Sequence, residues 1–402
     1  MSGIWNVLNY FKKKPPMEFQ WKQATHKQII PSSEYKQRRT NVMQNKEHPI
    51  VIFGNNTLLY SPHVNMPFKQ NSSFYYLTGI SIPDCIAILL PTRFSFEYHL
   101  FTPKQDPYSP PVEELKDCVV HPIAEFSNFL KKVNPSAVFS NHPPPITLMP
   151  HSIQQRWRLY TDPIPFKPLL LDELKVIKSE NELKAMSKAA TLNAMIMTKI
   201  MSETYRNEHE ILTDITHFAM QNNAELSFVP VIASGTNSIY PHYHQNNMPI
   251  NKKDVVVCDF GLSIEGYCSD MTRSWHTKPS DLYSEIYEKV EKVQAELIKS
   301  VNTSTSMDML ERDAKILLNK EFPFAPINVI FPHSVTHFIG LDLHDTMSIS
   351  SSKLLQKDSV ITIEPGVYFT PSKEVPKEYW GIGIRLEDVI LVGEKESIVL
   401  TS

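Results

Sequence analysis

Between residues 32 and 160 the chain alternates short apolar runs with polar stretches that carry prolines. The apolar runs predict strands at 50–53, 85–90 and 98–102. Prolines at 62, 103 and 143–145 punctuate the pattern and indicate turns and loops. Because helical segments lie between the strands, this part of the chain is expected to form a small α/β domain.

A different pattern follows residue 179. Ser179 with Glu182 three residues later can cap a helix reciprocally, and Leu183, Met186 and Ala190 then fall on one helical face. Tight hairpins among strands that helices also separate indicate a mixed, mainly antiparallel α+β domain. The helices are expected at 180–203, 208–223, 280–300 and 306–320, and extended segments at 255–260, 267–275, 360–369 and 382–392.

The length of 402 residues exceeds what one ordinary core accommodates, so we expect two domains. Prolines at 163, 165 and 168 place the boundary near residue 170. The expected division is a tail at 1–31, an amino-terminal domain at 32–170 and a second domain at 171–402. The first seventeen residues contain no acid and combine apolar side chains with Lys12, Lys13 and Lys14, which indicates a short organelle-targeting helix or, alternatively, a loosely docked tail.

The composition excludes several classes of function. A formal net charge of -3 and a pI near 6.6 give no broad basic field, so nucleic acid is not an expected partner. No run of about 18 uncharged apolar residues could span a bilayer, so we expect a soluble protein. The four cysteines show no CxxC spacing and are expected to be reduced, mostly buried thiols.

Two aspartates form the first candidate site. Asp259 ends an apolar strand, and Asp270 follows eleven residues later across an expected hairpin, so the two can face one another across paired strands. Carboxylates that close repel each other, which raises one pKa unless a cation lies between them. On their own, the two residues are better explained as ordinary turn-associated aspartates.

Three further residues favour a metal site. His337 supplies an imidazole, and Glu364 and Glu387 place carboxylates at or within otherwise apolar strands, where an uncompensated acid costs several kcal/mol. Four carboxylates and one histidine suit Mn²⁺, Co²⁺ or Zn²⁺ in a pair of ions about 3.5–4 Å apart.

These segments resemble the pita-bread metallopeptidases. The match runs from about 175 to 400, keeps the order of that family's five ligand segments, and implies a pita-bread fold with Asp259, Asp270, His337, Glu364 and Glu387 as ligands. Intact ligands distinguish the chain from metal-free relatives such as creatinase. The matching segments are Asp259–Gly261, Ser269–Arg273, His337–Asp345, Thr362–Gly366 and Gly383–Asp388.

The amino-terminal region is similar to the accessory domain of aminopeptidase P, which methionine aminopeptidases lack. The similarity lies in Glu34–Arg39 and Phe68–Gly79, and a short segment at Ala24–His26 is similar to the mitochondrial branch that includes the intermediate-cleaving peptidase. The compartment implied is intracellular, either mitochondrial or cytoplasmic. The expected partners are the amino termini of peptides or proteins and a second copy of the chain in a homodimer.

The resemblance implies a metal-dependent aminopeptidase that removes the first residue of a peptide, preferentially when proline is second. A hydroxide bridging two ions, expected to be Mn²⁺ with Co²⁺ or Zn²⁺ as alternatives, would attack the scissile carbonyl, and Glu364 would also carry the proton to the leaving nitrogen. His242 and His344 match the family's substrate-facing histidines. His333 and Arg385 match positions beyond the scissile bond, although Arg385 could also serve only to neutralise the acidic cluster.

Two departures from the aminopeptidase P pattern bear on proline selectivity. Ser334 stands where a glycine is usual, and residues 346–353 lack an aromatic that some relatives place near the substrate proline. Two other interpretations stay open: a prolidase, which shares these residues but cleaves only dipeptides, and a non-catalytic binding protein built on the same fold.

Overall fold

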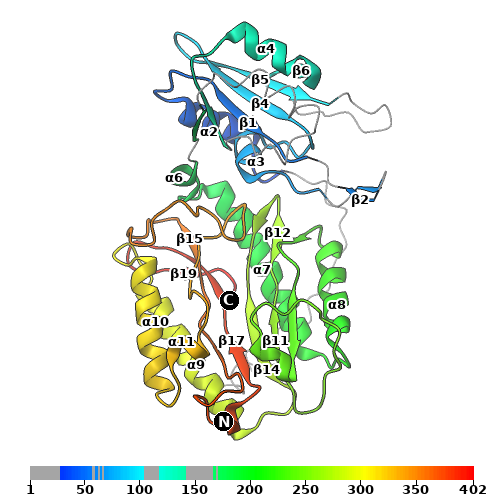
Figure 1. The fold of residues 1–402 in the computed structure, drawn as a ribbon, viewed down its shortest axis with the longest axis vertical. Coiled ribbons are helices and arrows are strands. Elements are labelled where there is room, and N and C mark those ends of the chain that lie inside the picture. The colour runs from blue at the N-terminus through cyan, green and yellow to red at the C-terminus, as the bar shows by residue number, and fades with distance from the viewer. Residues whose placement is uncertain are drawn as a thin grey trace, which may run out of the picture.

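The computed structural model describes residues 28–56, 59–61, 64–65, 68–103, 117–141, 166–168 and 171–402. In Figure 1 the described chain forms a smaller amino-terminal part, in blue and cyan, above a larger part that runs from green to red. The expected targeting segment, the similarity at Ala24–His26, and the prolines at 143–145, 163 and 165 lie outside the described residues.

The amino-terminal part is built on a six-stranded mixed sheet with the order β6-β5-β4-β1-β7-β8. In β1, Ile50 and Ile52 point into one apolar cluster and Val51 and Phe53 into another, so the sheet is buried on both faces. The strands are β1 (Ile50–Phe53), β4 (Ile86–Pro91), β5 (Phe96–Thr102), β6 (Val119–Pro122), β7 (Val138–Ser140) and β8 (Phe166–Pro168), with the separate pair β2 (Leu59–Ser61) and β3 (Val64–Asn65).

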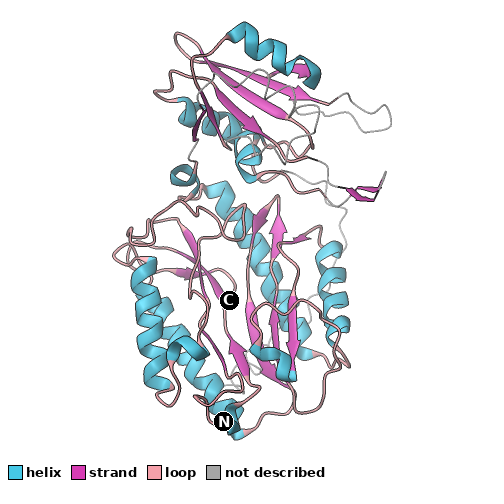
Figure 2. Cartoon of the chain, viewed as in Figure 1, coloured by secondary structure: helices cyan, strands magenta, loops and turns pink. Residues whose placement is uncertain are grey.

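Helices cover the two faces of this sheet. Phe126 and Leu130 of α4 (Phe126–Val133) pack on one face, and α2 (Ser32–Met43) and α3 (Ser72–Thr78) pack on the other. The three strands predicted in this domain are present, and the small α/β domain is confirmed (Figure 2).

The larger part places helices outside and short antiparallel strands inside. In Figures 1 and 2, α7 and α8 lie on one side of the strands and α9 and α10 on the other. The helices are α6 (Asp172–Lys175), α7 (Glu180–Ser202), α8 (Glu208–Gln221), α9 (Asp281–Ser300), α10 (Met307–Glu321) and α11 (Ile327–Ile330). The strands are β9 (Glu225–Leu226), β10 (Val231–Ser234), β11 (Val255–Asp259), β12 (Leu262–Ile264), β13 (Tyr267–Cys268), β14 (Thr272–His276), β15 (Val360–Ile363), β16 (Gly366–Tyr368), β17 (Gly383–Arg385), β18 (Asp388–Leu391) and β19 (Ile398–Val399).

The four predicted helices are all present, and their ends follow from local chemistry. Ser179 and Glu182 form the expected reciprocal cap of α7, while Asn207, Ser280 and Ser306 accept backbone N–H groups at the starts of α8, α9 and α10. Such caps satisfy donors that have no partner within the helix.

Three of the four predicted extended segments are interrupted in the structure. Residues 267–275 divide at 269–271, residues 360–369 divide at 364–365, and residues 382–392 divide at 386–387. The backbone leaves the strand at each of these points, and each break contains one of the predicted ligands.

The hairpin between the two aspartates is present. Its tip is the two-residue turn Glu265–Gly266, and both residues have positive φ (51° and 80°), as a tight hairpin turn requires. In β11 and β14, Asp259 pairs with Thr272, so Asp270 lies two residues before the position directly opposite Asp259.

An apolar cluster joins the two parts. It contains Tyr35, Phe74 and Leu77 from the amino-terminal part together with Ile339 and Leu341 from the larger part. The two-domain arrangement is therefore confirmed, while the boundary at residue 170 stays a prediction.

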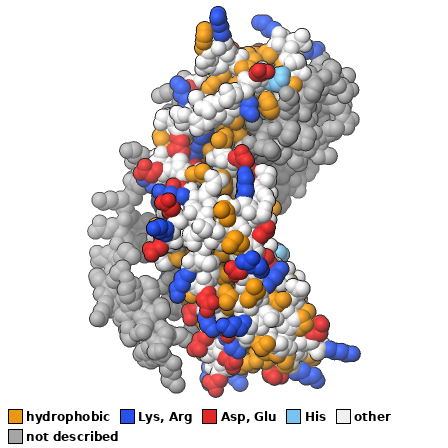
Figure 3. Space-filling model, turned by 90° about the vertical axis from the view of Figure 1, so that its left-hand side faces the viewer, with side chains coloured by type: hydrophobic (Ala, Val, Ile, Leu, Met, Phe, Trp, Pro, Cys, Tyr) orange, Lys and Arg blue, Asp and Glu red, His pale blue; other side chains and the backbone are white. Residues whose placement is uncertain are grey.

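The distribution of charged side chains on the surface agrees with the small net charge of the chain. Figure 3 looks onto the side where α10 lies, and Lys and Arg side chains are interspersed there with Asp and Glu. Within the described residues, no helix is both long and apolar enough to cross a membrane. None of the four cysteines forms a disulfide in the described part of the chain, and Cys85, Cys258 and Cys268 are buried.

Candidate metal centre and active site

The five predicted ligands occupy strand ends and strand breaks of the larger domain. Asp259 is the last residue of β11, and Asp270 lies between β13 and β14. Glu364 follows β15, and Glu387 directly precedes β18. His337 lies beside β15, because Thr362 donates its backbone N–H to the His337 carbonyl at 2.9 Å. Neighbouring strands therefore bring residues that are far apart in sequence to one place.

Three of these side chains converge closely. Asp270, His337 and Glu387 each offer a ligand atom, and these atoms all lie within 4.8 Å of one another. His337 Nε2 is 3.7 Å from an oxygen of Asp270 and 3.7 Å from an oxygen of Glu364. Asp259 is close enough to act electrostatically on Asp270, Glu364 and Glu387, so all five predicted ligands belong to one cluster.

The carboxylates of this cluster destabilise one another in the absence of a cation. Burial, together with the neighbouring Glu387 carboxylate, raises the pKa of both Asp270 and Glu364 well above the usual range. Burial and the Asp259 carboxylate raise the pKa of Glu387 to about 8. The site thus favours protons or a positive ion.

Two oxygen atoms show that a metal fits the site better than protein donors do. Asp259 Oδ1 and Asp270 Oδ1 are buried and have no hydrogen-bond partner within the described part of the chain. Buried polar atoms are nearly always paired, so two orphaned carboxylate oxygens in one cluster require a partner of another kind. Oxygen-rich sites with one imidazole suit hard or borderline divalent ions.

His337 is oriented as a ligand would be. Its Nδ1 lies 3.0 Å from the Phe338 carbonyl, which can only accept, so Nδ1 carries the proton and Nε2 presents its lone pair to the carboxylates. Burial, with a smaller effect of the nearby His344, lowers the pKa of His337 to about 4. The ring is therefore neutral near pH 7.

A chain of hydrogen bonds leads away from Asp259. Arg385 donates Nη2 to Asp259 Oδ2 at 2.6 Å and Nη1 to the Tyr368 hydroxyl at 2.6 Å. The Tyr368 hydroxyl is 2.9 Å from Nε2 of His333, whose Nδ1 donates to the Ser334 carbonyl at 2.8 Å. Arg385 thus both faces the acidic cluster and connects it to His333.

The predicted substrate histidines flank the cluster. His344 is exposed, and its ring centroid lies 4.3 Å from that of His337. His242 and His333 line a cavity of about 420 Å³ together with Tyr240, Pro241 and Pro332. His344 instead lines a second cavity, of about 400 Å³, at the junction of the two domains.

The two departures from the aminopeptidase P pattern lie in different places. Ser334 accepts from His333 through its carbonyl, beside the first cavity. Thr346 and Met347, from the segment without an aromatic, line the second cavity with His344. The two substitutions therefore need not act on the same part of a substrate.

Sequence reasoning missed two residues of the site. Thr272 donates its hydroxyl to Glu387 Oε2 at 2.7 Å and accepts from Arg385 Nε at 3.1 Å. Tyr368 connects Arg385 to His333. The hairpin register could have found Thr272, since it pairs with Asp259, whereas Tyr368 required the three-dimensional path.

Comparison with known families agrees with this geometry. Residues 184–394 match the model for metallopeptidase family M24, and residues 35–110 match the aminopeptidase P, N-terminal domain. The chain belongs to metallopeptidase family M24. The predicted metallopeptidase fold, and a metal-dependent aminopeptidase type of hydrolase, are thereby confirmed.

Several M24 relatives extend over nearly the whole chain. A Xaa-Pro aminopeptidase of Haemophilus influenzae is 29% identical and covers 93% of this chain and 95% of its own length. The mitochondrial intermediate cleaving peptidase 55 of Arabidopsis thaliana is 29% identical and covers 83% and 72%. The crystal structure of Icp55 from Saccharomyces cerevisiae superposes with a TM-score of 0.84 at 25% identity, covering 93% of this chain and 94% of that one. The resemblance to aminopeptidase P and its intermediate-cleaving branch is thus confirmed.

Proposed function

We propose that this M24 metallopeptidase removes the amino-terminal residue from peptides and prefers substrates with proline in the second position. The observation that carries the proposal is the cluster around Asp270, His337 and Glu387, where two buried carboxylate oxygens have no hydrogen-bond partner among the described residues. Relatives named Xaa-Pro aminopeptidase and intermediate cleaving peptidase support the substrate class.

Five residues would hold two divalent ions: Asp259, Asp270, His337, Glu364 and Glu387. Mn²⁺ is the expected ion, with Co²⁺ or Zn²⁺ as alternatives, because the donor set has four carboxylates and one imidazole. Bound ions of this kind polarise a carbonyl oxygen and make a water nucleophilic near neutral pH.

The protein's own side chains would divide the remaining work. Glu364, which would be a ligand as well, would carry a proton to the leaving nitrogen. His242 and His344 would donate hydrogen bonds to the substrate backbone. His333 and Arg385, connected through Tyr368, would form the wall beyond the scissile bond.

Three further assignments belong to the same proposal. The compartment would be mitochondrial, as the name of the Arabidopsis relative suggests, with the cytoplasm as the alternative. The chain would act as a homodimer. The functional division would follow 32–170 for the aminopeptidase P-like domain and 171–402 for the catalytic domain, with 1–31 as a tail or targeting segment.

A panel of matched peptides tests the substrate assignment. Leu-Pro-Ala-Ala and Leu-Ala-Ala-Ala, assayed with Mn²⁺ or Co²⁺, should both release leucine, with the proline peptide faster by roughly 10- to 200-fold, the range that a shaped apolar pocket supplies. Measurable cleavage of the second peptide is expected because Ser334 and the 346–353 segment depart from the usual pattern. Hydrolysis of the proline peptide alone would refute the relaxed selectivity and leave a strict Xaa-Pro specificity.

Two other outcomes would overturn the proposal itself. Cleavage of Gly-Pro without cleavage of any longer peptide would identify a prolidase. Absence of hydrolysis from a protein that binds two metal ions would favour a non-catalytic binding protein.

A further inference from the structure

A closed loop brings two histidines of the site together. The backbone N–H of Asp345 donates to the Phe338 carbonyl at 2.9 Å, which closes the loop that runs from 338 to 345. His337 and His344 each stand one residue before a partner in this hydrogen bond, and their ring centroids lie 4.3 Å apart. The neck of the loop therefore determines the distance between a predicted ligand and a predicted substrate histidine.

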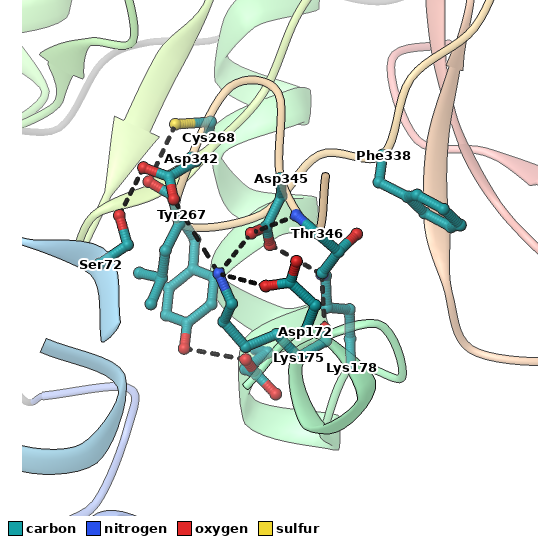
Figure 4. Close-up of polar contacts among 12 residues, drawn as sticks. Ser72, Asp172, Lys175, Lys178, Tyr267, Cys268, Phe338, Asp342, Asp345 and Thr346 are labelled. Carbon is teal, nitrogen blue, oxygen red and sulfur yellow. Dashed lines mark hydrogen bonds and ion pairs between the residues drawn. The ribbon is translucent and has the colours of Figure 1, made fainter. Parts of the chain in front are cut away.

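The side chain of Asp345 anchors this neck. It is 2% exposed, and its two oxygens lie 2.8 Å from Lys175 Nζ and 3.3 Å from Lys178 Nζ. Lys178 Nζ also donates to the Lys175 carbonyl at 2.7 Å, and the Thr346 N–H donates to Asp345 Oδ1 at 2.9 Å. Figure 4 shows the carboxylate between the two ammonium groups, which come from the segment that enters α7.

The loop has two backbone features that let the Asp345 carboxylate lie close to it. A Cβ on Gly340 would lie 2.2 Å from Asp345 Oδ2 and 2.9 Å from Lys178 Nζ, so the carboxylate can approach the loop backbone only over a glycine. Thr346 has φ of +49°, a conformation that β-branched residues avoid unless their surroundings hold them. The loop is thus built around the position of Asp345.

The opposite side of the loop is fixed to the amino-terminal domain. Ser72 of α3 donates its hydroxyl to Asp342 Oδ1, and Ile339 and Leu341 are buried in the apolar cluster that both domains share. His344 is exposed beside these anchors and lines the cavity at the domain junction. His344 therefore belongs to a loop that is anchored on two sides, while its own side chain stays exposed.

We propose that Asp345 is a positioning residue that sets the place of His344 through its ion pairs with Lys175 and Lys178. The inference rests on the proposed function of His344. It adds that the segment which enters α7 helps to hold this histidine in place. Because the carboxylate and both ammonium groups are buried, breaking these ion pairs would leave poorly compensated charges away from water.

Asp345→Asn keeps the shape of the side chain and removes its charge. We expect kcat on the proline peptide to fall by about 10- to 100-fold, the usual effect of removing an outer support of an active-site group, while KM and the metal content stay near the wild-type values. Lys175→Met should lower kcat in the same way but less, because Lys178 still pairs with Asp345, and it serves if the first variant does not fold.

A double-mutant cycle separates positioning from general damage. If Asp345 acts through His344, then Asp345→Asn in a His344→Ala background causes no further loss of kcat, whereas losses that multiply would overturn the proposal. Glu321→Gln is the control, since Glu321 pairs with Lys292 and lines neither cavity, and it should change kcat by less than about twofold.

Hydrogen exchange gives a readout that does not depend on activity. Asp345→Asn should speed exchange in residues 338–346 and leave β11 unchanged. A wild-type protein that cleaves no peptide would refute only the proposed function. The exchange result would still show whether Asp345 holds the loop in place. Unchanged exchange in 338–346 would overturn it.

Discussion

Two of the places where the larger domain buries carboxylates treat them in opposite ways. Around Asp270 and Glu387, four carboxylates meet one guanidinium, that of Arg385, and burial and mutual repulsion raise the pKa values of Asp270, Glu364 and Glu387. At Asp345, a single buried carboxylate meets two ammonium groups, which outweigh the effect of burial and lower its pKa. The same residue type is thus left unsatisfied in one cluster and fully paired in the other.

This difference indicates what each cluster is for. The Asp345 cluster has all its oxygens paired and needs no ligand, so its role is to hold the chain. The Asp270 cluster keeps two carboxylate oxygens that have no partner in the described ranges of the chain, an arrangement that destabilises the protein unless a cation binds. Residues that are poorly satisfied in the free protein are often the ones that a function requires.

The largest effect is expected from removing a ligand. Asp270→Ala or Glu364→Ala should abolish hydrolysis, with a loss on the order of 10³-fold or more, because the bound ions supply the nucleophile and polarise the carbonyl. Circular dichroism should show a folded protein. Near-normal turnover in either variant would remove the distinction between the two clusters.

A smaller effect is expected from the flanking histidines. His242→Ala and His344→Ala should each lower kcat on the order of 10²- to 10⁴-fold with both metals retained, since each would act on the substrate rather than on the ions. The check is steady-state kinetics together with metal analysis of the same sample. Kinetics equal to those of the wild type would mean that these two side chains are only structural.

Substitutions in the two clusters should change the unfolding free energy of the metal-free protein in opposite directions. Asp270→Asn relieves repulsion and should stabilise the metal-free protein by about 1–2 kcal/mol. Asp345→Asn removes the buried carboxylate that pairs with two ammonium groups and should destabilise the metal-free protein by about 3–5 kcal/mol. Chemical denaturation with a chelator present measures both, and shifts of the same sign would contradict the comparison.

The dependence of metal-free stability on pH follows from the same charges. His333 and His337 have pKa values lowered to about 4 from 6.5, so below pH 6.5 the unfolded chain takes up more protons and stability falls. The raised pKa of Glu387, about 8, means that the folded chain keeps a proton that the unfolded chain loses. Above about pH 7.5 the unfolded imidazoles have lost most of their protons and the raised carboxylate pKa values dominate, so metal-free stability should decrease as pH rises further toward 8.

Much of this arrangement could be predicted from the sequence because it is encoded locally. Apolar periodicity located the helices α7 to α10, and Ser179 marked the start of α7. The ligand types in their order indicated the cluster, and the structure brings all five together. The predicted strands were too long for a physical reason: the backbone leaves the strand where Asp270, Glu364 and Glu387 turn toward one another.

What could not be predicted depends on contacts between distant segments. Tyr368 lies 17 residues from Arg385 and 35 from His333, and no periodicity connects these three. Lys175 and Asp345 are 170 residues apart, and each alone resembles an ordinary surface charge. Their roles become apparent only once the fold has buried them, because burial is what makes an unpaired charge costly.

Metal content tests the central claim most directly. Protein purified without chelator, loaded with Mn²⁺ and freed of excess ion, should contain two ions per chain by elemental analysis, and Asp270→Ala should contain fewer than two. Asp345→Asn, with its carboxylate in the paired cluster, should keep both. A wild-type chain with no bound divalent ion, or an Asp270→Ala variant that still binds two, would contradict the account.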